Sequence, residues 1–195
     1  MKTFAEYYKD LLEWENTEHR ELISVWREDL ATEIEQDFKQ AVINAKIKDS
    51  FCSIRENSTN QSIGNQVEIY AIGELNKFLK VFAIESCLGA GYPDRVLAKG
   101  DFKQVALEMK ATSSWNPNDS NRRVLTSSSK RLRERFIAPI YHLICTIIYQ
   151  NQNPQYKIEA VRLDFIEPQT QVSVRLEASV NHKILASGNH KSIVF

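Results

Sequence analysis

The sequence predicts an α/β (α+β) protein in which a mixed central β-sheet is flanked by helices and preceded by an N-terminal helical segment. Helical spacing of apolar residues dominates residues 1–50 and returns from residue 61. Strand patterns follow, alternating or continuously apolar, between residues 95 and 180. At 195 residues the chain fits a single domain, 1–195, with a helical segment at 1–50 and a core at 60–165.

Composition narrows the class of protein. Apolar content of 43% and charged content of 26% are typical of a globular protein. Because the chain has no run of 18 apolar residues and its start lacks the apolar core of a signal peptide, we expect a cytoplasmic protein and no membrane partner. Three cysteines without a CxxC pair and four scattered histidines predict neither disulfides, nor a zinc site, nor Cys/His or Ser/His/Asp catalysis.

Charge is distributed unevenly along the chain although the net charge is zero. Residues 1–40 hold 11 acids and 5 bases, and the remaining residues hold 14 acids and 20 bases. An acidic front and a basic remainder suit a protein with one side facing DNA.

The N-terminal segment predicts two helices. Thr3 and Glu6 form a capping box, and apolar residues at helical spacing continue the first helix to residue 15. A second helix is expected to begin near Asn16 or Thr17 and to run towards Ala45.

A polar run at residues 53–62 separates these helices from a third. That helix is expected to begin at Gln61 and to end near Gly89 or Gly91, since glycine often caps helix C-termini. Its buried stripe comprises Ile63, Val67, Ala71, Leu75, Phe78 and Phe82.

The chemistry-bearing stretch is a predicted hairpin. Its strands are residues 95–98 and 102–112, and Lys99, Gly100 and Asp101 supply the turn. Because side chains alternate along a strand, Glu108 and Lys110 point to one face. Asp94 can then meet Glu108 across the hairpin.

Two carboxylates and an ammonium group at one point suit divalent-metal chemistry. Mg²⁺ prefers oxygen ligands, keeps several waters and takes one or two carboxylates from the protein, here Asp94 and Glu108. Bound Mg²⁺ neutralises a phosphodiester and lowers the pKa of a coordinated water. Lys110 can hold that water or the developing charge.

These residues resemble the motif of the PD-(D/E)XK nuclease superfamily, which includes most type II restriction endonucleases. Pro93-Asp94 stands for PD, and Glu108-Met109-Lys110 stands for (D/E)XK. The resemblance implies a restriction-endonuclease-like fold, Asp94 and Glu108 as metal ligands, Lys110 as the catalytic lysine, and the Met109 carbonyl as a further candidate ligand. It covers about residues 60–165.

The family also suggests a role for Glu68. Many nucleases of this kind carry an additional acid on the helix before the PD strand, and Gly64-Asn65-x-x-Glu68 looks like that element. The alternative is a surface glutamate without a catalytic role.

A basic segment after the hairpin is the candidate DNA-binding region. A polar loop leads into a short helix, residues 127–136, which a serine can cap and which Leu132 and Phe136 anchor. Phosphates are contacted by Arg, Lys and Ser, and bases by Asn, Gln and Arg. The candidates are Asn118, Asn121, Arg122, Arg123, Ser128, Lys130, Arg131, Arg133 and Arg135. The alternative is a solvated basic helix face.

Strand patterns complete the predicted sheet. Residues 141–149 are continuously apolar and predict a central strand. Residues 156–166 and 172–180 alternate and predict half-buried strands.

The resemblance implies a Mg²⁺-dependent type II restriction endonuclease that leaves 5′-phosphate ends on double-stranded DNA. A homodimer is expected for double-strand cleavage, and the family implies a methyltransferase that protects the same target. Three alternatives remain open: a structure-selective or repair nuclease of the same superfamily, a non-catalytic DNA-binding module, and a protein-interaction domain that uses the acidic helices.

Overall fold

The computed structural model describes residues 2–87, 92–114, 123–124, 128–152, 155–176, 180–184 and 191–195. Side chains of 123–124, 173–176 and 180–184 lie outside this description. The four helices of the described part are α1 (Phe4–Trp14), α2 (Glu28–Asn44), α3 (Asn60–Asn76) and α4 (Lys130–Arg135).

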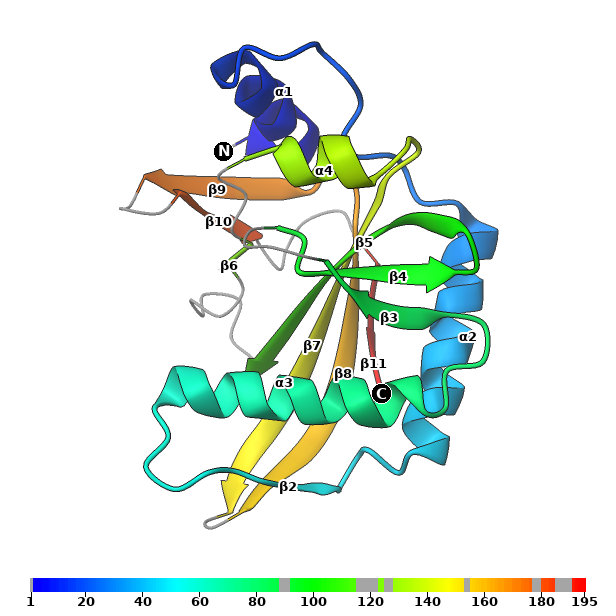
Figure 1. Cartoon of the computed structure of the whole chain (residues 1–195), viewed down its shortest axis with the longest axis vertical. Coiled ribbons are helices and arrows are strands. Elements are labelled where there is room, and N and C mark those ends of the chain that lie inside the picture. Colours follow the sequence, from blue (N-terminus) through cyan, green and yellow to red (C-terminus); the bar gives the residue numbers. More distant parts are fainter. Residues whose placement is uncertain are drawn as a thin grey trace.

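The strands form two sheets, and the larger one is mixed (Figure 1). The strands are β1 (Lys2–Thr3), β2 (Phe51–Ser53), β3 (Ala83–Ser86), β4 (Arg95–Lys99), β5 (Phe102–Thr112), β6 (Arg123–Val124), β7 (Tyr141–Gln152), β8 (Gln155–Ile166), β9 (Gln171–Leu176), β10 (Val180–Ile184) and β11 (Lys191–Val194). The central sheet has the order β11-β8-β7-β5-β4-β3, with β2 beside β8, and β5 and β7 are parallel. The smaller sheet has the order β1-β9-β10-β6. The predicted α+β class is therefore confirmed.

Each face of the central sheet carries its own hydrophobic core. Val105, Leu107 and Met109 of β5 belong to a core shared with α2 and α3. Ala106, on the opposite face, belongs to a second core shared with α1 and α4. The alternation of side chains along β5 separates the two cores.

The first helix agrees with the sequence. The Thr3 hydroxyl accepts a hydrogen bond from the Glu6 amide, and the Glu6 carboxylate accepts one from the Thr3 amide, which completes the capping box. The buried face of α1 then packs into the second core.

The predicted start of the second helix is wrong, since α2 begins at Glu28 rather than near Asn16 or Thr17. Residues 17–27 are irregular because main-chain groups among them bond to residues that border β7 and β8. The Ser24 amide donates to the Ile140 carbonyl at 2.8 Å, and the Trp26 amide donates to the Glu167 carboxylate at 3.3 Å. These tertiary hydrogen bonds replace the helical ones.

The predicted end of the third helix is also wrong. Helix α3 stops at Asn76, and strand β3 follows where helix was expected. The Asn76 side chain bonds both the amide and the carbonyl of Ile84, at 2.8 and 2.9 Å. The buried Asp37 carboxylate of α2 accepts the amides of residues 80–82. Side chains outside this segment thus provide hydrogen-bond partners for the main-chain groups that follow the helix.

The predicted hairpin and the predicted central strand are both confirmed. Strands β4 and β5 are antiparallel around Gly100, whose φ of 57° lies in the left-handed region that glycine adopts readily. Strand β7 is paired on both sides, with β5 and β8. The alternating pattern from Val172 begins in β9, which belongs to the smaller sheet.

No helix within the described ranges combines the length and apolar character needed to cross a bilayer.

Candidate active site

The candidate site lies where the second core gives way to polar side chains along β5. Ala106 is fully buried in that core, and Glu108 and Lys110 follow on the same face. Met109 between them is buried in the other core. Strand alternation therefore presents the acid and the lysine together, as the sequence predicted.

Asp94 and Glu108 meet across the hairpin. Arg95 pairs with Leu107, so Asp94 and Glu108 occupy the next positions of the two strands. The Asp94 amide donates to Glu108 Oε2 at 3.3 Å, and the Met109 amide donates to Asp94 Oδ1 at 3.3 Å. Each carboxylate thus accepts a hydrogen bond from a main-chain amide of the opposite side of the hairpin, and these bonds hold the two acids beside each other.

Lys110 completes this group. Its Nζ donates to Glu108 Oε1 at 2.6 Å. Burial by itself lowers the pKa of Lys110, but the carboxylates of Glu108, Asp94 and Glu68 outweigh burial and raise the pKa. Lys110 is therefore an ammonium ion at neutral pH, suited to hold an anion or a water rather than to accept a proton.

Glu68 reaches the same pocket from α3. Its carboxylate is bridged to Asp94 by Arg95, whose NH2 donates to Glu68 Oε1 at 3.3 Å and whose NH1 lies 3.8 Å from Asp94 Oδ2. Burial raises the pKa of Glu68, and Arg95 and Lys110 offset this only in part. Glu68 is thus near the other two acids, but a guanidinium lies between it and Asp94.

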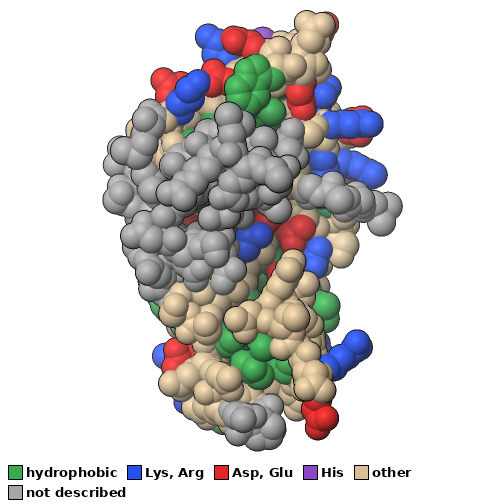
Figure 2. Space-filling view, turned by 90° about the vertical axis from the view of Figure 1, so that its left-hand side faces the viewer, with side chains coloured by type: hydrophobic (Ala, Val, Ile, Leu, Met, Phe, Trp, Pro, Cys, Tyr) green, Lys and Arg blue, Asp and Glu red, His purple; other side chains and the backbone are tan. Residues whose placement is uncertain are grey.

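Acidic and basic side chains both line the pocket, with one more acid than bases. Its volume is about 420 Å³, and the charged side chains that line it are Glu68, Asp94, Arg95, Glu108 and Lys110. Burial, followed by the charges of Glu108 and Glu68, raises the pKa of Asp94 to about 7. Figure 2 shows acidic and basic side chains side by side on one face of the molecule.

The donor set can be compared with what different metals need. No group of three or more His, Cys, Asp and Glu side chains in the described ranges is arranged to hold a metal ion. A structural zinc site with four protein ligands therefore does not fit these residues. Asp94 and Glu108 give two adjacent carboxylates, which fit Mg²⁺ because it takes one or two carboxylates and keeps its waters. A metal ligand role for either residue stays a prediction.

A buried hydrogen-bond chain behind the site was not foreseen. His142 Nε2 donates to the Leu22 carbonyl at 2.7 Å, because a carbonyl can only accept, and Nδ1 accepts from the Tyr92 hydroxyl at 2.6 Å. Burial lowers the pKa of His142 to about 4, so the ring is neutral. Tyr92 stacks on His142 with ring centroids 5.6 Å apart and directly precedes Pro93-Asp94.

Through this chain the N-terminal segment supports the site, although the family resemblance does not extend to that segment. The sequence did not indicate this hydrogen-bond chain, because a single histidine in an apolar strand does not reveal its partners. The sequence analysis also did not identify Arg95 as a residue of the site, although its position directly after Asp94 could have indicated it.

The basic helix is only partly directed towards solvent. Leu132 and Phe136 anchor α4 as predicted. Arg131 NH1 donates to the Pro93 carbonyl at 2.5 Å, and Arg133 bonds Ser129 and lies 3.6 Å from a Glu15 carboxylate oxygen. Ser128, Lys130 and Arg135 are exposed.

The serine that satisfies the first amide of α4 is Ser128, whose hydroxyl accepts a hydrogen bond from the Lys130 amide at 3.2 Å. Ser129 is at the N-cap position, but its side chain makes no capping bond. Its hydroxyl instead bonds the Glu15 carboxylate beyond α1. A tertiary partner has thus taken the Ser129 hydroxyl, while the neighbouring Ser128 bonds the helix.

Four candidate DNA contacts have side chains outside the described part of the structure. Asn118, Asn121 and Arg122 lie entirely outside the described residues. Of Arg123 only the backbone is described, as part of β6 paired with β10.

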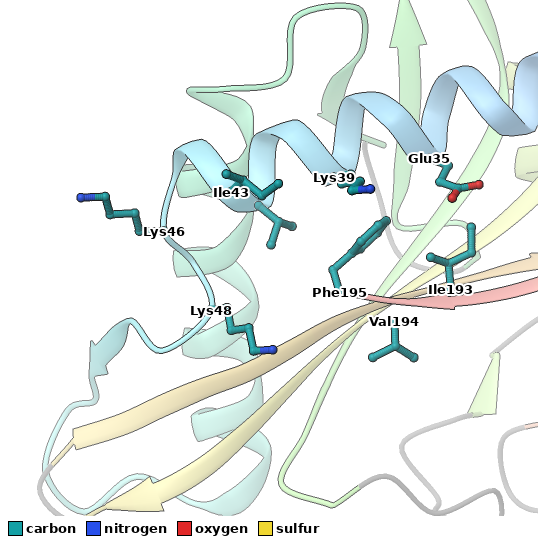
Figure 3. Close-up of a pocket in the computed structure, with 9 residues that line it drawn as sticks. Glu35, Lys39, Ile43, Lys46, Lys48, Ile193, Val194 and Phe195 are labelled. Carbon is teal, nitrogen blue, oxygen red and sulfur yellow. The ribbon is translucent and has the colours of Figure 1, made fainter.

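A second pocket, about 580 Å³ in volume, lies between α2 and β11 (Figure 3). It is lined by apolar side chains and three lysines, and the Lys46 side chain points away from the other lining residues in Figure 3. Its one lining carboxylate side chain, Glu35, is paired with Lys191 at 2.7 Å. This pocket therefore lacks the paired acids of the candidate site.

Comparison with models of protein families, with curated proteins and with solved structures gives no significant match.

Proposed function

We propose that this protein is a Mg²⁺-dependent endonuclease of the restriction type that hydrolyses double-stranded DNA. The observation that carries the proposal is the adjacency of Asp94, Glu108 and Lys110 in one pocket beside a further acid, Glu68. The resemblance of Pro93-Asp94 and Glu108-Met109-Lys110 to the nuclease motif supports the same reaction.

In the proposed reaction, Asp94 and Glu108 would hold Mg²⁺, which would lower the pKa of a water and neutralise phosphate charge. Lys110 is held by Glu108 and keeps its proton, so it orients the water and stabilises the developing negative charge. The chain of Leu22, His142 and Tyr92 fixes the backbone before Asp94.

The bond changes follow from in-line attack at phosphorus. The water oxygen joins phosphorus while the bond from phosphorus to the 3′ oxygen breaks. The water passes a proton to solvent and the 3′ oxygen takes one up from solvent, so the products are a 5′-phosphate and a 3′-hydroxyl. One site cuts one strand, and the proposal therefore includes a homodimer on double-stranded DNA. It also includes a methyltransferase partner that protects the target.

The test is incubation of purified protein with unmethylated phage DNA in Mg²⁺ and, separately, in EDTA. Discrete fragments in Mg²⁺ alone are expected, and sequencing of their ends gives the target. Asp94→Asn should be inactive. Asp101→Asn, which alters an exposed acid in the turn of the same hairpin, is the matched control and should cut normally.

Each other outcome has a distinct meaning. A smear or nicked circles would indicate a structure-selective or repair nuclease. Salt-sensitive DNA binding without cleavage would indicate a binding module. If the protein showed no DNA binding and no DNA cleavage, the nucleic-acid proposal would be overturned altogether.

A further inference from the structure

Arg95 lies inside the candidate site but is not part of the motif. Its NH1 donates to the Asp94 carbonyl at 3.0 Å, and its NH2 contacts the Glu68 carboxylate. Its side chain is 20% exposed, so the guanidinium borders the pocket rather than being sealed beneath it.

The charges of the pocket indicate what the site is built to receive. Three acids and two bases line it, which leaves one negative charge in excess when all are ionised. A divalent cation changes that excess to one positive charge. A single phosphodiester, with one negative charge, then makes the site neutral.

The same charges distinguish the roles of the two bases. Lys110 is bonded to Glu108 at 2.6 Å, whereas Arg95 contacts Glu68 at 3.3 Å and lies 3.8 Å from Asp94 Oδ2. The contacts of Arg95 to carboxylates are therefore longer than that of Lys110, and Arg95 is the base that lies between two acids. A cation bound at Asp94 draws that carboxylate away from the guanidinium.

From this arrangement we propose that Arg95 is an internal counter-ion that competes with the divalent cation in DNA-free protein and binds the phosphodiester in the complex. The guanidinium fork matches two phosphate oxygens. DNA binding therefore removes the competitor and favours metal binding, so that the site is loaded where substrate is present. This inference rests on the proposed nuclease function.

The test separates metal affinity from activity. Mn²⁺ binding to the whole DNA-free protein is measured by the electron paramagnetic resonance of free Mn²⁺, and DNA cleavage is measured at saturating Mn²⁺. Arg95→Gln, which keeps hydrogen-bonding groups but no charge, should bind Mn²⁺ ~10-fold more tightly, given couplings of ~5- to 150-fold between linked sites. It should cleave at least ~10-fold more slowly, since a phosphate contact is lost.

Controls distinguish the possible failures. Lys99→Gln removes a cation at the far end of β4, where it pairs with Glu33, and should change neither quantity. Arg95→Lys should restore weak Mn²⁺ binding but only part of the cleavage, because lysine lacks the planar fork. Circular dichroism and thermal melting verify that each variant is folded, and Arg95→Lys still tests the proposal if Arg95→Gln does not fold.

The outcomes are distinguishable. If wild-type protein binds Mn²⁺ and cuts DNA but Arg95→Gln has unchanged or weaker Mn²⁺ affinity, the counter-ion role is overturned. If its Mn²⁺ affinity rises and cleavage is unchanged, the phosphate contact is overturned. Wild-type protein that neither binds Mn²⁺ nor cuts DNA would overturn the proposed function and this inference with it.

Discussion

Two acid–base pairs lie on the same face of the central sheet, two strands apart, and differ in their surroundings. Glu108 and Lys110 of β5 are aligned through β7 with Asp164 and Arg162 of β8. Within each pair, the acid and the base are two residues apart along one strand. Arg162 bonds Asp164 through Nε and NH2, at 3.0 and 2.9 Å, and also contacts Ser192, while the Asp164 side chain is 1% exposed.

The comparison separates a structural ion pair from a candidate active site. Asp164 has a bidentate cation and is sealed from solvent. Glu108 has one bond to Lys110 and faces two further acids in a pocket. An acid and a base on one strand face do not indicate catalysis by themselves. The additional acids and the accessible volume distinguish the β5 pair.

The largest expected effect is on activity at the β5 pair. Lys110→Ala should reduce DNA cleavage by at least about 10³-fold, in the range found when one group that stabilises developing charge is removed. DNA binding and fold should be retained, because the lysine borders the pocket. Gel assays of cleavage and of binding measure the two effects.

The matched control is Lys103→Ala, an exposed lysine on the same strand that pairs with Glu85. It should cut DNA at the wild-type rate. Normal DNA cleavage by Lys110→Ala would show that the β5 pair has no catalytic role.

The next effect is on stability at the β8 pair. Asp164→Asn should lower the free energy of unfolding by about 3–5 kcal/mol, because it leaves the half-buried Arg162 without its full counter-charge. Denaturant titration measures the loss. Cleavage by the molecules that remain folded should be unchanged.

Asp49→Asn is the control for an exposed pair, since the Asp49 side chain is 64% exposed beside Lys157. It should change the free energy of unfolding very little, because solvent screens the charges of an exposed pair. An equally small loss for Asp164→Asn would mean that burial does not distinguish these pairs.

A smaller effect of opposite sign is expected at Asp94. In EDTA at pH 8, Asp94→Asn should raise the free energy of unfolding by about 1–2 kcal/mol, since it removes one of three crowded acids. The folded pKa of Asp94, about 7, exceeds its unfolded value of about 3.9, so ionisation of Asp94 opposes folding from about pH 4 upwards and its cost is complete above pH 7.

The stability gain of Asp94→Asn should therefore shrink as the pH falls from 7 and vanish below about pH 4, where Asp94 is protonated in both states. Thermal melts of both proteins across this range measure it. A variant less stable than wild type at pH 8 would show that Asp94 is structural, like Asp164.

The smallest effect concerns the basic helix. Arg135→Ala removes one exposed charge and should lower the slope of log affinity against log salt by about 1 if Arg135 contacts a phosphate. Arg133→Ala should instead lower stability, because Arg133 bonds Ser129 and lies beside Glu15. Binding titrations at several salt concentrations compare the two. Identical salt slopes for wild type and Arg135→Ala would exclude a phosphate contact.

Local patterns in the sequence determined the elements that depend on neighbours in the chain. The capping box at Thr3, the turn at Gly100 and the alternation along β5 each act within a few residues, and each is present. The approach of Asp94 to Glu108 followed from the same hairpin. The α+β class followed from the order of helical and strand patterns.

Tertiary structure decided what depends on distant partners. Residues 17–27 are not helical because Ile140, before β7, and Glu167, after β8, take their main-chain hydrogen bonds. Helix α3 ends at Asn76 because the Asn76 side chain bonds Ile84 and the Asp37 carboxylate binds the amides that follow. The Tyr92–His142 bond and the bridge from Arg95 to Glu68 join residues 50 and 27 positions apart. No local pattern encodes such pairs, because packing of separate elements brings them together.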